Sequence, residues 1–268
     1  MPAPHNLFKA ALAERRLQIG LWQDLASPYC TELCANAGYD WLLIDGEHGP
    51  NDLVTISGQI AALRGSRSHA IVRPPVGEAW IIKQILDAGA QTILVPMVET
   101  AEQAQALVRA MRYPPHGIRG VGAVVGRASD FGRISDYTLT ADAETCLLVQ
   151  VETTKGLENL DEIASVDGVD GVFIGPADLA ASLGHLDNPA HPHVQDVIED
   201  MIARIIRHGK AAGILIGDLA LSKHYAELGA TFVAIGHDVG LLALGASKLL
   251  EDFHATAPAR ATDKTKVY

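Results

Sequence analysis

Short, mostly apolar runs rich in β-branched residues recur along the chain and alternate with longer segments of helical character. Eight such runs are present, at residues 19–22, 41–45, 70–74, 92–96, 146–152, 171–176, 212–217 and 232–237. Runs of this kind are typical of strands that are buried on both faces of a parallel sheet. Eight strands alternating with helices over about 250 residues predict a single α/β domain, a (β/α)8 barrel, with a doubly wound open sheet as the alternative.

Helix-capping patterns support this alternation. Ser27 followed by Pro28 is typical of a helix start. Thr100 and Gln103 form a capping-box pattern, and a long amphipathic helix is expected between residues 192 and 209.

The sequence predicts a single domain, because no repeat or low-complexity linker divides the chain. We expect one barrel domain over residues 1–254 and a disordered tail over residues 255–268, which have little to bury. A glycine-rich stretch, residues 113–137, separates the fourth and fifth runs. Long loops in compact domains are usually functional, so we expect a mobile loop over the site.

Charge and apolar content narrow the class of protein. The 21 Lys and Arg residues against 32 Asp and Glu give a formal charge of -11, which disfavours a nucleic-acid partner. No apolar run is long enough to span a bilayer, and the first residues lack a signal-peptide pattern, so a cytoplasmic protein without a membrane partner is expected. The 3 cysteines support neither a disulfide framework nor a zinc knuckle.

Polar side chains gather where the predicted strands end, which in barrel enzymes is the place of the active site. They are Asp45, Glu47 and His48 after the second run, Arg73 at the end of the third, Gln150 and Glu152 at the end of the fifth, and Asp178 after the sixth. Side chains two apart on a strand share a face, so Gln150 and Glu152 both point into the barrel mouth. Arg73 has a second interpretation, as a structural ion-pair partner of Asp45 or Glu47.

Glu152 and Asp178 come from neighbouring strands and offer the oxygen ligands that suit Mg, Mn or Co. Two carboxylates are few ligands, so such a metal would be shared with a chelating substrate such as a 2-oxo acid. Asp178 also opens a helix, and the backbone amides of Ala177 and Asp178 could therefore face an anion.

Several segments carry a family resemblance: GYDWLLIDGEHGPND, VRPP, LDAGAQTILVPMVET, RYPPHGIRGVG, QVET and GVDGVFIGPADLAASLG. In this order and spacing, over about residues 19–253, the chain resembles the HpcH/HpaI aldolases, the class II pyruvate aldolases. The resemblance implies a divalent-metal-dependent lyase that cleaves 4-hydroxy-2-oxo acids reversibly to pyruvate and an aldehyde through an enolate of pyruvate. Such enzymes serve the breakdown of aromatic or sugar acids.

The resemblance also implies roles for single residues. It assigns the metal to Glu152 and Asp178, acid-base chemistry to His48, the pyruvate oxygen to Arg73, an increase in His48 basicity to Asp87, and substrate contacts to Gln150, Gly175, Ala177 and Asp178. Homologues are typically homohexamers, dimers of trimers that exchange their last helix, so Asp87 could act within one subunit or across a boundary. We expect His48 to be assisted by Asp45 or Asp87.

Two other functions stay open at this point. A Schiff-base aldolase needs a lysine at a strand end, and only Lys155 lies near one. A barrel that merely binds an oxyacid would share the fold without catalysis.

The segment after the first run departs from the family pattern. Gln23 and Asp24 stand where small or apolar residues are usual, and we expect both to reach the mouth and to act on the acceptor aldehyde. Trp22, at the same barrel end, is either a core residue or part of the substrate wall.

Overall fold

The computed structural model describes residues 1–255 and contains a closed barrel of parallel strands in the order β1 to β8. The strands are β1 (Gln18–Gln23), β2 (Trp41–Asp45), β3 (His69–Arg73), β4 (Thr92–Val95), β5 (Cys146–Val151), β6 (Gly171–Ile174), β7 (Ala211–Leu215) and β8 (Phe232–His237). Each coincides with one of the eight predicted runs to within two residues. The predicted (β/α)8 barrel is confirmed, and the open sheet is excluded.

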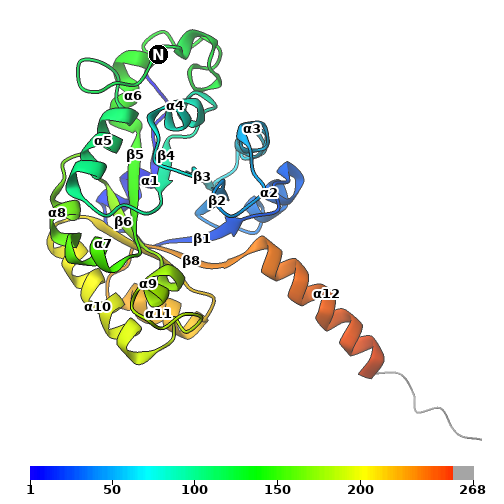
Figure 1. Cartoon of the computed structure of the whole chain (residues 1–268). Coiled ribbons are helices and arrows are strands. Elements are labelled where there is room, and N and C mark those ends of the chain that lie inside the picture. Colours follow the sequence, from blue (N-terminus) through cyan, green and yellow to red (C-terminus); the bar gives the residue numbers. More distant parts are fainter. Residues whose placement is uncertain (256–268) are drawn as a thin grey trace, which may run out of the picture.

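Most of the helices connect consecutive strands and lie outside the barrel, whereas α1 precedes β1 and α12 follows β8 (Figure 1). The helices are α1 (Leu7–Ala13), α2 (Pro28–Ala35), α3 (Leu53–Ala62), α4 (Ala79–Asp87), α5 (Ala101–Met111), α6 (Tyr137–Glu144), α7 (Thr154–Glu158), α8 (Leu160–Ser165), α9 (Pro176–Ser182), α10 (Pro192–Arg207), α11 (Leu219–Glu227) and α12 (Asp238–Ala255), with the 3-10 turns η1 (Ala123–Val125) and η2 (Arg127–Ser129). The predicted caps at Ser27 and Thr100 are present, the latter as a full capping box.

Large aromatic side chains fill the barrel interior. Trp22 lies 5.4 Å from Phe173 and Trp41 lies 6.4 Å from Phe232, measured between ring centroids. All four are at least 97% buried, at exposures of 3%, 2%, 0% and 1%. The interior is therefore a packed core, and substrate can reach only its two ends.

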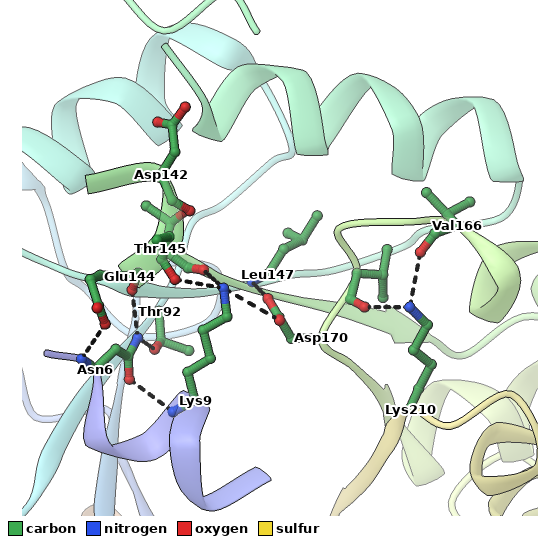
Figure 2. Close-up of polar contacts among 12 residues, drawn as sticks. Asn6, Lys9, Thr92, Asp142, Glu144, Thr145, Leu147, Val166, Asp170 and Lys210 are labelled. Atoms are coloured by element: carbon green, nitrogen blue, oxygen red, sulfur yellow. Dashed lines mark hydrogen bonds and ion pairs between the residues drawn. The ribbon is translucent and has the colours of Figure 1, made fainter. Parts of the chain in front are cut away.

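The amino-terminal end of the barrel is closed by α1. Phe8 of this helix packs edge-on against Trp41, at 6.2 Å between ring centroids. Lys9 reaches from α1 to carbonyl oxygens ahead of β5, and Asn6 bonds to Thr92 at the start of β4 (Figure 2). This short helix thus ties the first residues to the strand starts.

The glycine-rich stretch lies at this same amino-terminal end, so the expectation of a loop over the chain's own mouth is wrong. Arg127 donates to the carbonyl of Ala88, just after α4 ends, and the amide of Asp136 donates to Met1. Helix α5 runs back from the mouth after β4, and the stretch that follows it must therefore begin at the opposite end.

Helix α12 leaves the barrel after β8 and extends away from it (Figure 1). Several of its leucines are exposed, at 58% for Leu241, 62% for Leu242, 73% for Leu249 and 60% for Leu250. Despite this apolar surface, none of the helices within residues 1–255 combines the length and apolarity that a membrane crossing requires. The tail predicted over residues 255–268 lies outside the described residues except for Ala255, which ends α12.

Candidate active site

Asp45 ends β2 and is held as an anion at the carboxyl-terminal end of the barrel. Its Oδ1 accepts from Arg73 Nε at 2.8 Å and from the Glu47 amide at 2.9 Å, and its Oδ2 accepts from Trp22 Nε1 at 3.2 Å. Burial alone would raise the pKa of Asp45, but the hydrogen bonds and charge of Arg73, with the backbone amides, lower it below its ordinary value. Asp45 is therefore a fixed counter-ion for Arg73.

Arg73 ends β3 and lies between two carboxylates. Besides Asp45, which also accepts from Nη2 at 2.5 Å, its Nη1 lies 2.9 Å from Glu47 Oε2. The guanidinium carbon lies 5.2 Å from the Trp22 ring centroid. The structural interpretation of Arg73 is thus observed. It leaves a catalytic role open, because these contacts use three of the five N–H groups of a guanidinium.

Gln150 lies on the inner face of β5 and Glu152, directly after the strand, lies on the same side, as the two-residue spacing predicts. Each is only 2% exposed, and Gln150 Nε2 donates to Glu152 Oε2. Glu152 Oε1 accepts from the Met97 amide at 2.9 Å. Burial raises the pKa of Glu152, and the nearby Asp178 and Glu47 add to this effect, whereas the donors oppose it.

Helix α9 brings the next group of predicted residues to the mouth. Its first turn carries Ala177 and Asp178, both exposed, and its N-cap is Gly175, which supplies no side-chain cap. A side chain at Gly175 would collide with Glu152, so glycine is required for the close approach of this helix to β5. Asp178 is near enough for its charge to act on both Glu152 and Glu47.

The donor set fits a divalent ion of the oxygen-preferring class. Within residues 1–255 no three His, Cys, Asp or Glu side chains are grouped so as to hold a metal ion, so Glu152 and Asp178 form a pair without a third such ligand. Gln150 Oε1 is buried with no hydrogen-bond partner in the described part of the chain. A metal here would take its other ligands from water and a chelating substrate, as the sequence predicts.

His48 lies on the solvent side of this group. Its side chain is 69% exposed, and Nε2 lies 3.8 Å from Glu47 Oε2. Its backbone amide donates to Asp45 Oδ1 at 3.4 Å. Asp45 therefore positions the His48 backbone, and the nearest carboxylate to the imidazole is that of Glu47.

Asp87 does not lie beside His48 within one chain. It is the last residue of α4, and its Oδ1 accepts from Arg119 Nη2 at 2.7 Å. Since α4 runs from the end of β3 back to the start of β4, Asp87 lies at the amino-terminal end of the barrel, opposite His48. An action of Asp87 on His48 within the same subunit is therefore excluded.

Trp22 and Gln23 at the end of β1 and Asp24 directly after it have different surroundings. Trp22 faces the interior and is 3% exposed, which shows core packing beneath Arg73. Gln23 is fully buried on the outer face of the strand, where its Nε2 donates to the carbonyl of Trp22 at 3.2 Å and its side chain lies near Cys34 of α2. The expectation that Gln23 reaches the mouth is wrong. Asp24 does lie beside the mouth, since its carboxyl is near enough to Asp45 and Arg73 for their charges to act on its pKa.

Sequence reasoning missed Asp238, which holds this corner together. Its carboxylate accepts the amides of Asp24 at 2.8 Å and Leu25 at 3.2 Å, and it is 5% exposed. Asp238 directly follows β8, so the rule applied to the other strand ends would have found it.

Comparison with known proteins decides the family. The model of the HpcH/HpaI aldolase/citrate lyase family matches residues 18–244, from the first strand into α12. The chain belongs to this family. The resemblance inferred from the sequence motifs is thereby confirmed.

Relatives of the HpcH/HpaI family match nearly the whole chain. The hydroxypyruvate/pyruvate aldolase of Roseovarius nubinhibens is 59% identical over 250 residues, which are 93% of this chain and 97% of that protein. The 4-hydroxy-2-oxo-heptane-1,7-dioate aldolase of Klebsiella pneumoniae is 53% identical and covers 98% of this chain and 100% of its own. A family protein from Burkholderia cenocepacia has a solved structure with a TM-score of 0.89 at 40% identity, covering 93% and 99% of the two chains.

Membership of the HpcH/HpaI family also settles the kind of protein. The close relatives are named aldolases, and aldolases are carbon-carbon lyases acting on small molecules. The predicted carbon-carbon lyase is confirmed. The alternative function, a barrel that binds an oxyacid without catalysis, is therefore rejected. Lys155, the residue that a Schiff base would require, lies in α7 with Nζ 3.2 Å from Glu99 Oε2.

Proposed function

We propose that the chain is a class II aldolase that reversibly cleaves 4-hydroxy-2-oxo acids to pyruvate and an aldehyde. The observation that carries this proposal is the meeting of Arg73 with the Glu152 and Asp178 carboxylates at one barrel mouth. The relatives named for pyruvate and for a 4-hydroxy-2-oxo acid support the substrate class.

Arg73 would stabilise the enolate of pyruvate. Its bonds to Asp45 and Glu47 fix the guanidinium, and two N–H groups remain for a substrate oxygen. Donors fixed before the reaction, and aimed at charge that develops during it, lower the barrier most.

Glu152 and Asp178 would hold a divalent ion, Mg, Mn or Co, and such an ion when bound supplies Lewis-acid polarisation of a ketone oxygen. Gln150, with its buried and unpartnered Oε1, would orient a water or a substrate hydroxyl beside them. The amides of Ala177 and Asp178, beside Gly175, would face the substrate carboxylate.

His48 would move the protons. In the cleavage direction the imidazole takes the proton of the 4-hydroxyl, directly or through a water, while the bond between carbons 3 and 4 breaks and the aldehyde forms. A proton then returns to carbon 3, which becomes the methyl group of pyruvate. The exposure of His48 keeps it within reach of solvent.

Assembly would complete the site. Because Asp87 lies at the opposite end of its own barrel, it could assist His48 only from a neighbouring subunit. The exposed leucines of α12 favour packing of this helix on another copy, as in a hexamer built as a dimer of trimers with exchanged last helices.

Metal dependence tests the proposed function. Pyruvate release from 4-hydroxy-2-oxo acids should be abolished by excess chelator and restored by Mg, Mn or Co. Glu152→Gln should lower both activity and the stoichiometry of bound metal, whereas Lys155→Met should lower neither. Full activity in excess chelator, or a covalent adduct trapped by borohydride with pyruvate, would overturn the proposal.

A further inference from the structure

A fully buried arginine lies at the amino-terminal end of the barrel, and the fold gives it one acid. The side chain of Arg119 is 0% exposed, and the ion pair that it forms within residues 1–255 joins Nη2 to Asp87 Oδ1 at 2.7 Å. Its Nε and Nη1 are buried without a hydrogen-bond partner in the described part of the chain. A buried guanidinium is tolerated only where its charge is compensated, so Arg119 depends on Asp87.

Packing fixes the direction of the Arg119 side chain. Its guanidinium carbon lies 4.5 Å from the ring centroid of Tyr113 and 5.8 Å from that of Tyr137, and both tyrosines are buried. The Arg119 amide donates to the carbonyl of Arg112 at 2.8 Å, which closes a turn after α5. A Cβ at Gly117 would collide with the same carbonyl, so this turn requires glycine. The guanidinium is therefore a rigid support for the acid that it binds.

The carboxylate of Asp87 is fixed through one oxygen and left open through the other. Oδ1 accepts the hydrogen bond of Arg119, whereas Oδ2 accepts none from residues 1–255. Asp87 is the last residue of α4, and its side chain is 25% exposed although that of its partner is fully buried. A Cβ at Gly122 would lie 3.7 Å from Oδ2, so the residue beside this oxygen is one without a side chain. The pair thus presents one carboxylate oxygen at the surface.

The Asp45–Arg73 pair of the same molecule shows the alternative, a closed pair. There both carboxylate oxygens are bonded to the guanidinium, Oδ1 to Nε at 2.8 Å and Oδ2 to Nη2 at 2.5 Å, and Asp45 is 1% exposed. An acid that only neutralised Arg119 would be held in the same way. Asp87 instead keeps one oxygen for a donor that residues 1–255 do not supply.

We infer that Arg119 is a positioning residue, which binds one oxygen of Asp87 and thereby aims the other at the His48 imidazole of a neighbouring subunit. This deepens the proposed function and rests on it, because the action of Asp87 across a subunit boundary is part of that proposal. A carboxylate bonded to one imidazole nitrogen fixes the orientation and the tautomer of the ring, so that the other nitrogen is ready to take the proton of the 4-hydroxyl. Arg119 touches neither substrate nor His48 and acts only through Asp87.

The substitution Arg119→Lys tests the inference. An ammonium keeps a positive charge beside Asp87 but lacks the planar fork that rests against the two tyrosine rings. The kcat for aldol cleavage should therefore fall by about 10- to 100-fold while KM for the oxo acid changes little, because the support of the acid-base residue is lost and the substrate contacts are not. Arg109→Lys, at an exposed position in α5, is the matched control and should retain wild-type kinetics.

Co-expression with His48→Ala separates positioning across subunits from a purely structural role. His48→Ala chains bring an intact Arg119–Asp87 pair, and Arg119→Lys chains bring an intact His48, so mouths that combine the two are complete. Mixed oligomers should therefore regain part of the wild-type activity. No recovery would overturn the inference, because a residue that serves only its own barrel leaves both kinds of mouth defective.

Asp87→Asn distinguishes failure of the inference from failure of the proposed function. The amide keeps an oxygen for Arg119 but loses the charge, so this variant should slow cleavage at least as much as Arg119→Lys does. A slow Asp87→Asn enzyme beside a fully active Arg119→Lys enzyme would overturn the inference alone, whereas absence of metal-dependent pyruvate release from the wild type would overturn the proposed function. If Arg119→Lys does not fold, Asp87→Glu replaces it. This variant keeps the pair but moves the free oxygen, and a wild-type kcat in it would contradict the inference.

Discussion

Both ends of the barrel hold charged side chains that are at least partly shielded from solvent, but their partners differ. At the amino-terminal end Lys9 Nζ donates to the carbonyls of Ala143 at 3.0 Å and Thr145 at 2.7 Å, and lies 3.6 Å from Asp170 (Figure 2). Lys210 is likewise held by two carbonyls. Both lysines thus have two or more oxygen partners.

At the mouth, carboxylates outnumber the cations. Within residues 1–255 Arg73 is the arginine or lysine that faces Asp45, Glu47 and Glu152. Burial raises the pKa of Glu47 although Arg73 lowers it, and raises the pKa of Glu152 although its hydrogen-bond donors lower it. Charged side chains whose partners neutralise them stabilise a fold. A cluster with more carboxylates than cations, and with perturbed pKa values, is instead typical of a site that binds a cationic or proton-donating ligand. The difference assigns stability to one end and chemistry to the other.

The substitution His48→Ala at the mouth should have the largest effect on activity, and it tests the assignment of chemistry to this end of the barrel. We expect aldol cleavage to fall by roughly 100- to 10,000-fold, the usual range for acid-base catalysis, without loss of stability, because the side chain is mostly exposed. Unchanged turnover would contradict the assignment. Mixing this variant with Asp87→Ala adds a control: mixed oligomers should regain part of the activity only if Asp87 acts across subunits.

Replacing Arg73 is the second test, because it acts on the half-reaction common to all acceptors. Arg73→Ala should lower both cleavage and the exchange of pyruvate methyl protons with deuterated water by roughly 100- to 1,000-fold. Arg73→Lys should restore little, since an ammonium cannot reproduce the fork that binds Asp45 and Glu47. If proton exchange stays at the wild-type rate while cleavage falls, Arg73 does not stabilise the enolate.

Much of this mouth follows from the sequence, because parallel strands in a closed barrel all end at the same side. The eight apolar runs therefore predict not only the fold but also the meeting of Asp45, Arg73 and Glu152. The same rule, applied to the end of β8, would have added Asp238.

The failures of prediction have equally simple causes. Gln23 follows the inward-facing Trp22 on a strand, and because side chains alternate between the two faces it must point outward. The prediction for Gln23 relied on the departure from the family pattern and overlooked this alternation. Asp87 ends a helix that runs away from the mouth, and the glycine-rich stretch follows another such helix. What the sequence of one chain cannot supply is which neighbouring copy approaches a given mouth.

The smallest expected effect on catalysis tests the other end of the barrel. Lys9→Met keeps the length and apolar part of the side chain but removes the donors to Ala143 and Thr145 and the charge beside Asp170. We expect the free energy of unfolding to fall by about 3 kcal/mol, because carbonyls and a carboxylate lose a charged partner. Burial raises the pKa of Asp170 and Lys9 opposes this, so the variant should also lose stability more steeply as pH rises from 4 toward neutrality. Denaturant unfolding at several pH values measures both effects.

The control Lys223→Met, at an exposed site, should change neither the free energy of unfolding nor its dependence on pH. Activity per folded molecule should equal that of the wild type in both variants, and a loss of turnover in Lys9→Met without a loss of stability would break the division between the two ends.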